Sequence, residues 1–263
     1  MDKRDKSIPW QLYGAELIGT ALLVLVGLSI VILNFGQGNP VVQRWPDAGV
    51  RRLITGFLFG TTGALITLSP IGKESGAHIN PAVTLAFWLM GKLKASHALG
   101  YVLAQLAGAA IGALPLLAWG AMGRSIDFGA TIPNTTYGLG GALLGETLTT
   151  FVLIGGLFYF LQHQRLRAFT PAIFPFMYAA MVFLEANVSG TSTNPARSLC
   201  PSLISGNWYG WWVYWLGPLL GTLFGVAILR KAGWHRSKLL IAKLHYFEHD
   251  RYGVFRSRSK GLA

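Results

Sequence analysis

Six stretches of the sequence are apolar over about 20 residues, which is long enough for each to cross a bilayer as a helix. The composition agrees, since 52% of the 263 residues are hydrophobic and only 12% are charged. A soluble domain usually carries about twice that charged fraction. The sequence therefore predicts an all-α membrane protein whose six transmembrane helices lie at about residues 11–33, 53–70, 95–120, 139–161, 171–188 and 209–229.

Two further apolar segments, residues 81–89 and 195–204, are too short to span a membrane. Non-helical backbone at membrane depth is tolerated only where protein or a water-filled cavity surrounds it. We therefore expect two re-entrant half-helices that enter the bilayer and do not cross it. Each follows an Asn-Pro-Ala triplet, and the residues of the two triplets are Asn80, Pro81, Ala82, Asn194, Pro195 and Ala196.

The two halves of the chain follow the same order of features. Each has a glutamate early in its first long helix, Glu16 or Glu146, and an Asn-Pro-Ala triplet after its second. Three spans per half reverse the direction of the second copy, which predicts an inverted repeat. We expect one channel domain over residues 1–230, with repeats at about 11–120 and 139–230, and a basic tail at 231–263.

Each Asn-Pro-Ala triplet is a strong signal for the start of a helix. Asparagine is a favoured N-cap, and its side-chain oxygen accepts a backbone N–H of the first turn. Proline suits the first helical position. Because the two half-helices enter from opposite faces, their partly positive N-termini meet near the midplane. The amide NH2 groups of Asn80 and Asn194 would then donate hydrogen bonds to a passing oxygen, and the site would repel cations.

At these residues the sequence resembles the aquaporin, or major intrinsic protein, family and its prokaryotic water channels. Residues 75–84 look like the family's first pore loop and residues 190–198 like its second, and the resemblance covers about residues 11–230. It implies a homotetramer with one pore per subunit that conducts water passively along an osmotic gradient and excludes ions and protons. It implies no enzymatic activity, cofactor or metal.

The resemblance also assigns a selectivity filter. Arg197 would form one wall, where its permanent charge repels cations, and Thr191 would add a backbone carbonyl. Val182 takes the fifth-helix position, where water-selective members usually have histidine. The second-helix position falls on Gly60 when counted from Asn80, and on Phe59 when the Phe-Gly step is aligned.

The permeant solute stays open at this point. Val182 leaves a filter wide enough to consider an aquaglyceroporin-like channel for glycerol or other small uncharged solutes. Ser198 and the pair Tyr214-Trp215 instead match the water-channel pattern. A secondary transporter is a rival of a different class, because inverted repeats and broken helices occur there too.

Several other polar residues receive expected roles. In the family, glutamates at the positions of Glu16 and Glu146 accept hydrogen bonds from the pore loops, and we expect His78 to fix the shape of the first loop. Glu185 lies one helical turn beyond Val182. It is expected either to make the outer vestibule acidic or to form a salt bridge between subunits.

The formal net charge of +12 suggests a membrane surface as partner, because the charges avoid the apolar stretches. Most of the 22 Lys and Arg residues fall on the side that carries both termini. By the positive-inside rule both termini are expected to be cytoplasmic, in the plasma (inner) membrane. The tail would lie on the anionic leaflet or be disordered, and no nucleic-acid partner is expected.

Overall fold

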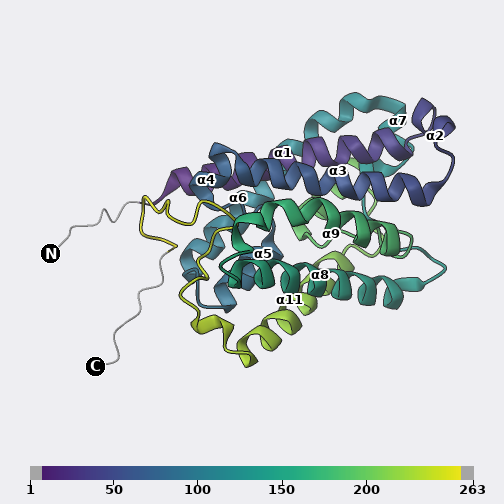
Figure 1. The fold of residues 1–263 in the computed structure, drawn as a ribbon. Helices are drawn as coiled ribbons and strands as arrows, with labels where there is room; N and C mark the ends of the chain where they lie inside the picture. Colours follow the sequence, from purple (N-terminus) through teal and green to yellow (C-terminus); the bar gives the residue numbers. More distant parts are fainter. Residues whose placement is uncertain (1–7, 256–263) are drawn as a thin grey trace, which may run out of the picture.

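The computed structural model describes residues 8–255, which form a bundle of helices without a strand (Figure 1). Within that range, six helices are long: α1 (Trp10–Phe35), α3 (Ala48–Leu68), α6 (Ala95–Ala113), α8 (Gly138–Gln162), α9 (Thr170–Glu185) and α11 (Val213–Lys231). The half-helices are α5 (Pro81–Leu89) and α10 (Pro195–Ser205), and short connections include α2 (Pro40–Arg44), α4 (Pro70–Ser75) and α7 (Gly120–Arg124). The predicted fold class is confirmed.

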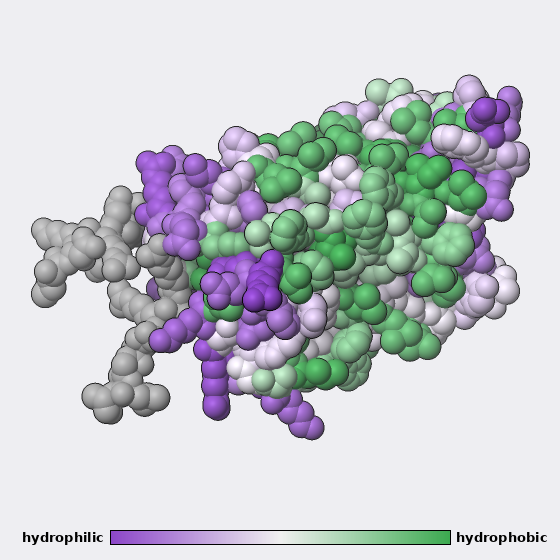
Figure 2. Space-filling view, viewed as in Figure 1, coloured by the Kyte–Doolittle hydropathy of each residue, from purple (hydrophilic) through white to green (hydrophobic). Residues whose placement is uncertain are grey.

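An apolar belt covers the middle of the bundle. Figure 2 shows apolar side chains over the centre of the visible face and hydrophilic ones toward its two ends. The stretches that contain α1, α6, α8, α9 and α11 are long and apolar enough to cross a membrane. The sixth long helix, α3, is less apolar because it carries Arg51 and Arg52 near its N-terminus, but it packs against α1 and α9 within the bundle.

Helix ends differ from the prediction where polar or special residues set them. The second span begins five residues earlier than predicted, since the side chain of Asp47 caps α3 by accepting from the N–H of Val50 at 2.8 Å. The third span was predicted to reach residue 120, but α6 ends at Ala113 and the chain continues as a 3-10 turn that contains Pro115. Both half-helices begin where predicted.

Glycines let the helices of each half approach closely. A Cβ on Gly108 of α6 would overlap the carbonyl oxygen of Leu17 on α1, and a Cβ on Gly221 of α11 would overlap that of Thr147 on α8. The α1–α6 and α8–α11 pairs therefore repeat the same contact in the two halves. The halves meet mainly along α3 and α9, where Gly56 permits a similar approach. Small residues at such contacts are typical of membrane helix pairs.

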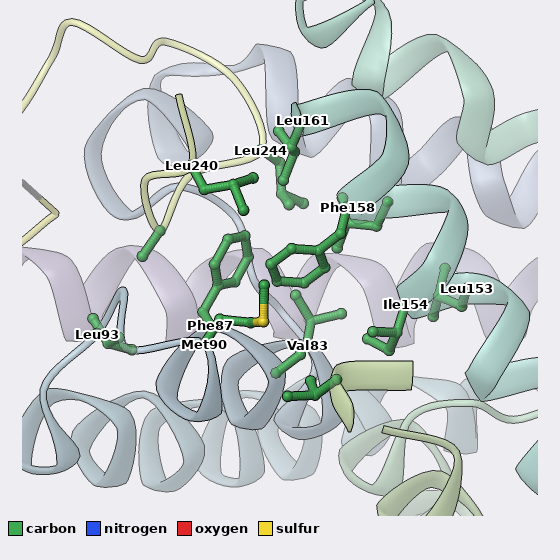
Figure 3. Packing of buried hydrophobic residues seen from close by; sticks show 14 of the residues in the cluster. Val83, Phe87, Met90, Leu93, Leu153, Ile154, Phe158, Leu161, Leu240 and Leu244 are labelled. Atoms are coloured by element: carbon green, nitrogen blue, oxygen red, sulfur yellow. The ribbon is translucent and has the colours of Figure 1, made fainter. Parts of the chain in front are cut away.

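The chain after α11 packs back onto the bundle. Leu240, Ala242, Leu244 and Phe255 are each at most 3% exposed, and they belong to the same buried cluster as Phe158 of α8 (Figure 3). The expectation of a disordered tail was therefore wrong over its described part, because its apolar side chains are buried against the helices. Contact of the tail with the anionic leaflet stays a prediction. Residues 256–263 lie outside the described residues.

We predict that Gly108→Ala lowers the stability of the folded protein, because the added methyl group overlaps the backbone of α1. Overpacking of this kind costs about 1–3 kcal/mol. Thermal unfolding in detergent should show a lower midpoint than in the parent. Gly14→Ala is the control, since nothing lies within 4 Å of a Cβ at Gly14. Equal midpoints for the two variants would contradict the close α1–α6 contact.

Candidate functional site

Asn80 and Asn194 lie at the buried starts of the two half-helices and bond across to each other's loop. Each side-chain oxygen accepts from the backbone N–H two residues later, at 2.8 and 3.1 Å. Each side-chain nitrogen donates to the opposite loop: Asn80 Nδ2 to the carbonyl of Thr193 at 2.9 Å, and Asn194 Nδ2 to that of Ile79 at 3.0 Å. An amide NH2 has two N–H groups, so each asparagine keeps one for another acceptor.

The loops that precede the half-helices share a strained backbone. Ala77 and Ile79 have φ of +54° and +42°, and Thr191 and Thr193 have φ of +53° at both positions. Residues with a Cβ rarely adopt this region, and each costs on the order of 1–3 kcal/mol unless its surroundings impose it. In both loops these positive φ values occur at every second residue. The neighbouring side chains therefore hold the two loops in the same conformation.

Glu16 supplies those surroundings for the first loop. Its Oε1 accepts from the N–H of His78 at 2.9 Å, and its Oε2 accepts from the N–H of Ile79 at 2.7 Å. Gln105 of α6 donates to the same Oε2 at 2.7 Å. The carboxylate is fully buried, so these bonds take the place of water and hold the loop backbone.

Glu146 makes the corresponding bonds in the second loop. Its Oε1 accepts from the N–H of Ser192 and from the hydroxyl of Ser189, both at 2.7 Å. Its Oε2 accepts from the N–H of Thr193 at 2.8 Å. Two carboxylates in matching places of the two halves thus hold two loops of the same shape.

One tyrosine holds the beginning of each pore loop. The Tyr101 hydroxyl of α6 donates to the carbonyl of Ser75, and the Tyr214 hydroxyl of α11 donates to that of Ser189, both at 2.7 Å. This role of the two tyrosines was not predicted from the sequence. The available signal was a tyrosine in the third long helix of each half, about 20 residues after the asparagine of its triplet.

Arg197 lies in the first turn of α10 and is only 6% exposed. Its Nη1 donates to the carbonyl of Gly129 at 2.9 Å, and its Cζ lies 5.9 Å from the centre of the Phe59 ring. Within the described part of the chain, no carboxylate forms a salt bridge with it. The structure thus brings together an arginine without a paired carboxylate and an aromatic ring.

Phe59 and Gly60 both line the cavity described below, but they differ in their other contacts. Phe59 is buried beside Arg197, and its ring centre lies 5.8 Å from that of Tyr178. A Cβ on Gly60 would overlap a backbone carbonyl of α9, so Gly60 mainly serves the contact between α3 and α9. Val182 is half-buried on α9 and follows Tyr178 by four residues, which places both on one side of that helix.

Both expectations for Glu185 were wrong. The residue is 9% exposed, and its side chain packs against Gly145 of α8 within the same chain. Its Oε2 accepts from the hydroxyl of Thr191 at 2.5 Å. The carboxylate therefore supports the second pore loop from behind, and it is too enclosed to line a vestibule or to reach a second subunit.

His78 is enclosed between the first half-helix and the tail. Its Nδ1 lies 3.2 Å from the hydroxyl of Thr84, and its ring stacks on Phe87 with 4.6 Å between centres. Its Nε2 lies 3.0 Å from the carbonyl oxygen of Ala242. No sequence pattern indicates this partner, which lies 164 residues away.

A cavity of about 40 Å³ lies between the half-helices. Since a water molecule occupies about 10–15 Å³ on this measure, the cavity holds roughly three waters. Its walls include Asn80, Asn194, Phe59, His78 and the tail residue Leu244. Residues 8–255 contain no group of three His, Cys, Asp or Glu side chains placed to bind a metal.

The cavity also has apolar walls that the sequence analysis missed, among them Leu23, Leu153 and Tyr178. Each lies in a long helix that is apolar on all sides. A side chain that faces the cavity there has the same character as one that faces lipid, so the sequence carried no signal for these positions.

Comparison with known proteins decides the family. The model of the major intrinsic protein family matches residues 3–229. The chain belongs to this family. This membership confirms the resemblance noted in the sequence.

Curated relatives agree with membership in the major intrinsic protein family, and a solved structure shares the fold. The chain is 32% identical to mouse aquaporin-4 over 83% of its own length and 66% of that protein, just under two thirds. It is 31% identical to the chicken lens fiber major intrinsic protein over 89% of its own length and 86% of that protein. The fold matches the aquaglyceroporin of Plasmodium falciparum with a TM-score of 0.70 at 20% identity, over 85% of this chain and 96% of that one.

We predict that Glu146→Gln destabilises the second pore loop. A glutamine offers one acceptor where the carboxylate offers two, and it directs an NH2 group at a backbone N–H. Each buried donor left unpaired costs about 1–3 kcal/mol. Thermal unfolding in detergent should show a lower midpoint, and solute flux per folded channel should fall.

Asp47→Asn is the matched control for the loss of one negative charge. Its side chain caps α3 at the surface, and asparagine caps helices equally well. If Glu146→Gln were as stable and as permeable as Asp47→Asn, the loop would not depend on the carboxylate.

Proposed function

We propose that the chain is a passive water channel driven by osmotic gradients, and that it excludes ions and protons. The observation that carries this proposal is the meeting of Asn80 and Asn194, each at the start of a half-helix, in a cavity large enough for only a few waters. A narrow path with few polar groups favours a small neutral permeant over an ion.

The two asparagines act on a water molecule at the middle of the path. The remaining N–H of each amide donates to the water oxygen, and the half-helix N-termini add positive potential from both sides. A water held by its oxygen directs its hydrogens away from the asparagines. Apolar neighbours such as Leu23 and Val83 bind water weakly and let it move on.

Arg197 excludes cations at the filter. The guanidinium stays charged at ordinary pH, and no carboxylate pairs with it among the described residues, so its field acts on the path. By donating hydrogen bonds, the guanidinium also replaces some of those that a water molecule loses when it enters the filter. Thr191 contributes to the filter through the loop that Glu146 and Glu185 hold.

Phe59 is the second-helix filter residue in this proposal, because its ring lies beside Arg197 while Gly60 is directed at α9. The ring narrows the opening and favours water. Val182, in place of a larger polar residue, favours the second candidate, a channel that also passes glycerol or similar small uncharged solutes. Ser198 and Tyr214-Trp215 support water as the main permeant.

The oligomeric state of the protein and the membrane that holds it are also part of this proposal. We expect a homotetramer in the plasma (inner) membrane, with residues 1–230 as the channel domain of each subunit. The start of α1 and the tail lie at one end of the bundle (Figure 1), where Arg251 donates to Gln11 at 3.1 Å. The positive-inside rule places that end in the cytoplasm.

Stopped-flow light scattering of proteoliposomes tests the proposal. Under a sucrose gradient, vesicles with the full chain should shrink faster than empty ones, and under a glycerol gradient they should shrink without rapid re-swelling. Rapid re-swelling in glycerol would favour the second candidate. Shrinkage no faster than in empty vesicles, both for the full chain and for Leu244→Asp, which changes the tail residue in the cavity wall, would contradict a water channel.

We predict that Phe59→Ala raises glycerol permeability relative to water permeability, because removal of the ring widens the filter beside Arg197. Phe57→Ala is the control: Phe57 lies on the same helix but is 41% exposed on the outer surface of the bundle. Re-swelling rates in glycerol measure the effect. An unchanged ratio of glycerol to water permeability in Phe59→Ala would remove Phe59 from the filter.

A further inference from the structure

The C-terminal tail contributes to the wall of the cavity between the half-helices. Leu244, located 13 residues after the end of α11, is part of the cavity wall together with Asn80 and Asn194. The side chain is 3% exposed. An apolar residue from outside the helical bundle therefore borders the path proposed for water.

The tail is bonded directly to the first pore loop at this point. The backbone N–H of Leu244 donates to the carbonyl of Gly76 at 3.1 Å. Two residues earlier, the carbonyl of Ala242 lies 3.0 Å from Nε2 of His78. The segment thus satisfies polar groups of the loop that would otherwise face the mouth of the pore.

Apolar side chains complete the fit. Figure 3 shows Leu240 and Leu244 of the tail directed toward Phe87, Phe158 and Leu161, and all five belong to one buried cluster. This apolar seat lies on α5 and α8, so the tail bridges the first half-helix and the second repeat.

Further contacts hold the tail across the rim of the same end. Lys92 Nζ donates to the carbonyl of Ser237 at 2.8 Å. His249 Nε2 lies 3.2 Å from the Glu74 carboxylate. The guanidinium of Arg167 lies 3.7 Å from the Phe247 ring centre. Lys92 lies between α5 and α6, Glu74 lies in α4, and Arg167 lies between α8 and α9.

We propose that residues 240–255 form an autoinhibitory plug of the cytoplasmic mouth, with Leu244 as the residue that blocks the path. The inference rests on the proposed water function, because a plug requires a conducting pore. When the segment leaves its seat, the mouth opens to the cytoplasm and water flow rises.

Lys243 makes the docked state reversible. Its side chain is buried, its Nζ donates to the carbonyl of Lys73 at 2.5 Å, and it lies 4.7 Å from the Phe255 ring centre. Loss of hydration lowers the pKa of Lys243 to about 8, although Asp250 and Glu74 act in the opposite direction and Lys73 acts in the same one. A buried ammonium opposes docking, whereas an apolar residue at this place would strengthen it.

The test is the osmotic water permeability of the full chain and of Leu244→Asp in proteoliposomes. A carboxylate does not fit the apolar seat, so the plug should leave it. If the docked form predominates, permeability per folded channel should rise at least about threefold. Lys238→Gln is the matched control, since it changes the charge by the same amount at an exposed tail position and should leave permeability unchanged. Equal permeability of Leu244→Asp and the parent would overturn the plug.

A labelling measurement reads docking without using water flow. In a Cys200→Ala background, Leu244→Cys should react with a water-soluble maleimide much more slowly than Lys238→Cys. Equal rates would overturn docking even if Leu244→Asp failed to fold. If labelling is slow but neither the parent nor Leu244→Asp conducts water above empty vesicles, the water function fails and the docked tail stands.

Discussion

The backbone N–H groups of the two pore loops must find acceptors inside the bundle, because a membrane offers no water to replace them. Glu16 and Glu146 meet that requirement with a fully buried carboxylate each. Without these acceptors the strained turns at Ile79 and Thr193 would relax. The positions of both asparagines, and with them the cavity, depend on the two carboxylates.

The same constraint explains why the two halves look alike in detail. A loop of one shape needs a buried acid, a tyrosine at its beginning and a glycine contact that brings the neighbouring helix close, and both halves supply this set. Because the halves are inverted, the two half-helices point their N-termini at one place. The crossed bonds of Asn80 and Asn194 then link the halves at their centre.

Much of this arrangement could be predicted from the sequence. The half-helix starts followed from the capping chemistry of Asn-Pro-Ala, and the long helices followed from apolar length. The ends of α3 and α6 were less accurate, since Asp47 and Pro115 act locally within otherwise continuous patterns. Glu185 was misplaced because its position on α9 gave its helical side but not its neighbour, Gly145 of α8.

The packing of the tail against the helices could not be predicted from the sequence. Its basic residues indicated a lipid surface, and its leucines and aromatic residues fitted that reading equally well. The contact between His78 and Ala242 joins residues far apart in the chain, and no periodic pattern marks such a pair. Only the arrangement of the helices creates the apolar seat that receives Leu240 and Leu244.

The most direct test of the account measures water and proton flow in the same proteoliposomes. Vesicles that contain the full chain and a pH-sensitive dye are exposed to an osmotic gradient together with a pH gradient. The account predicts shrinkage faster than in empty vesicles, with the pH gradient retained as in empty vesicles. Shrinkage at the rate of empty vesicles by both the full chain and Leu244→Asp, or rapid loss of the pH gradient through the protein, would contradict it.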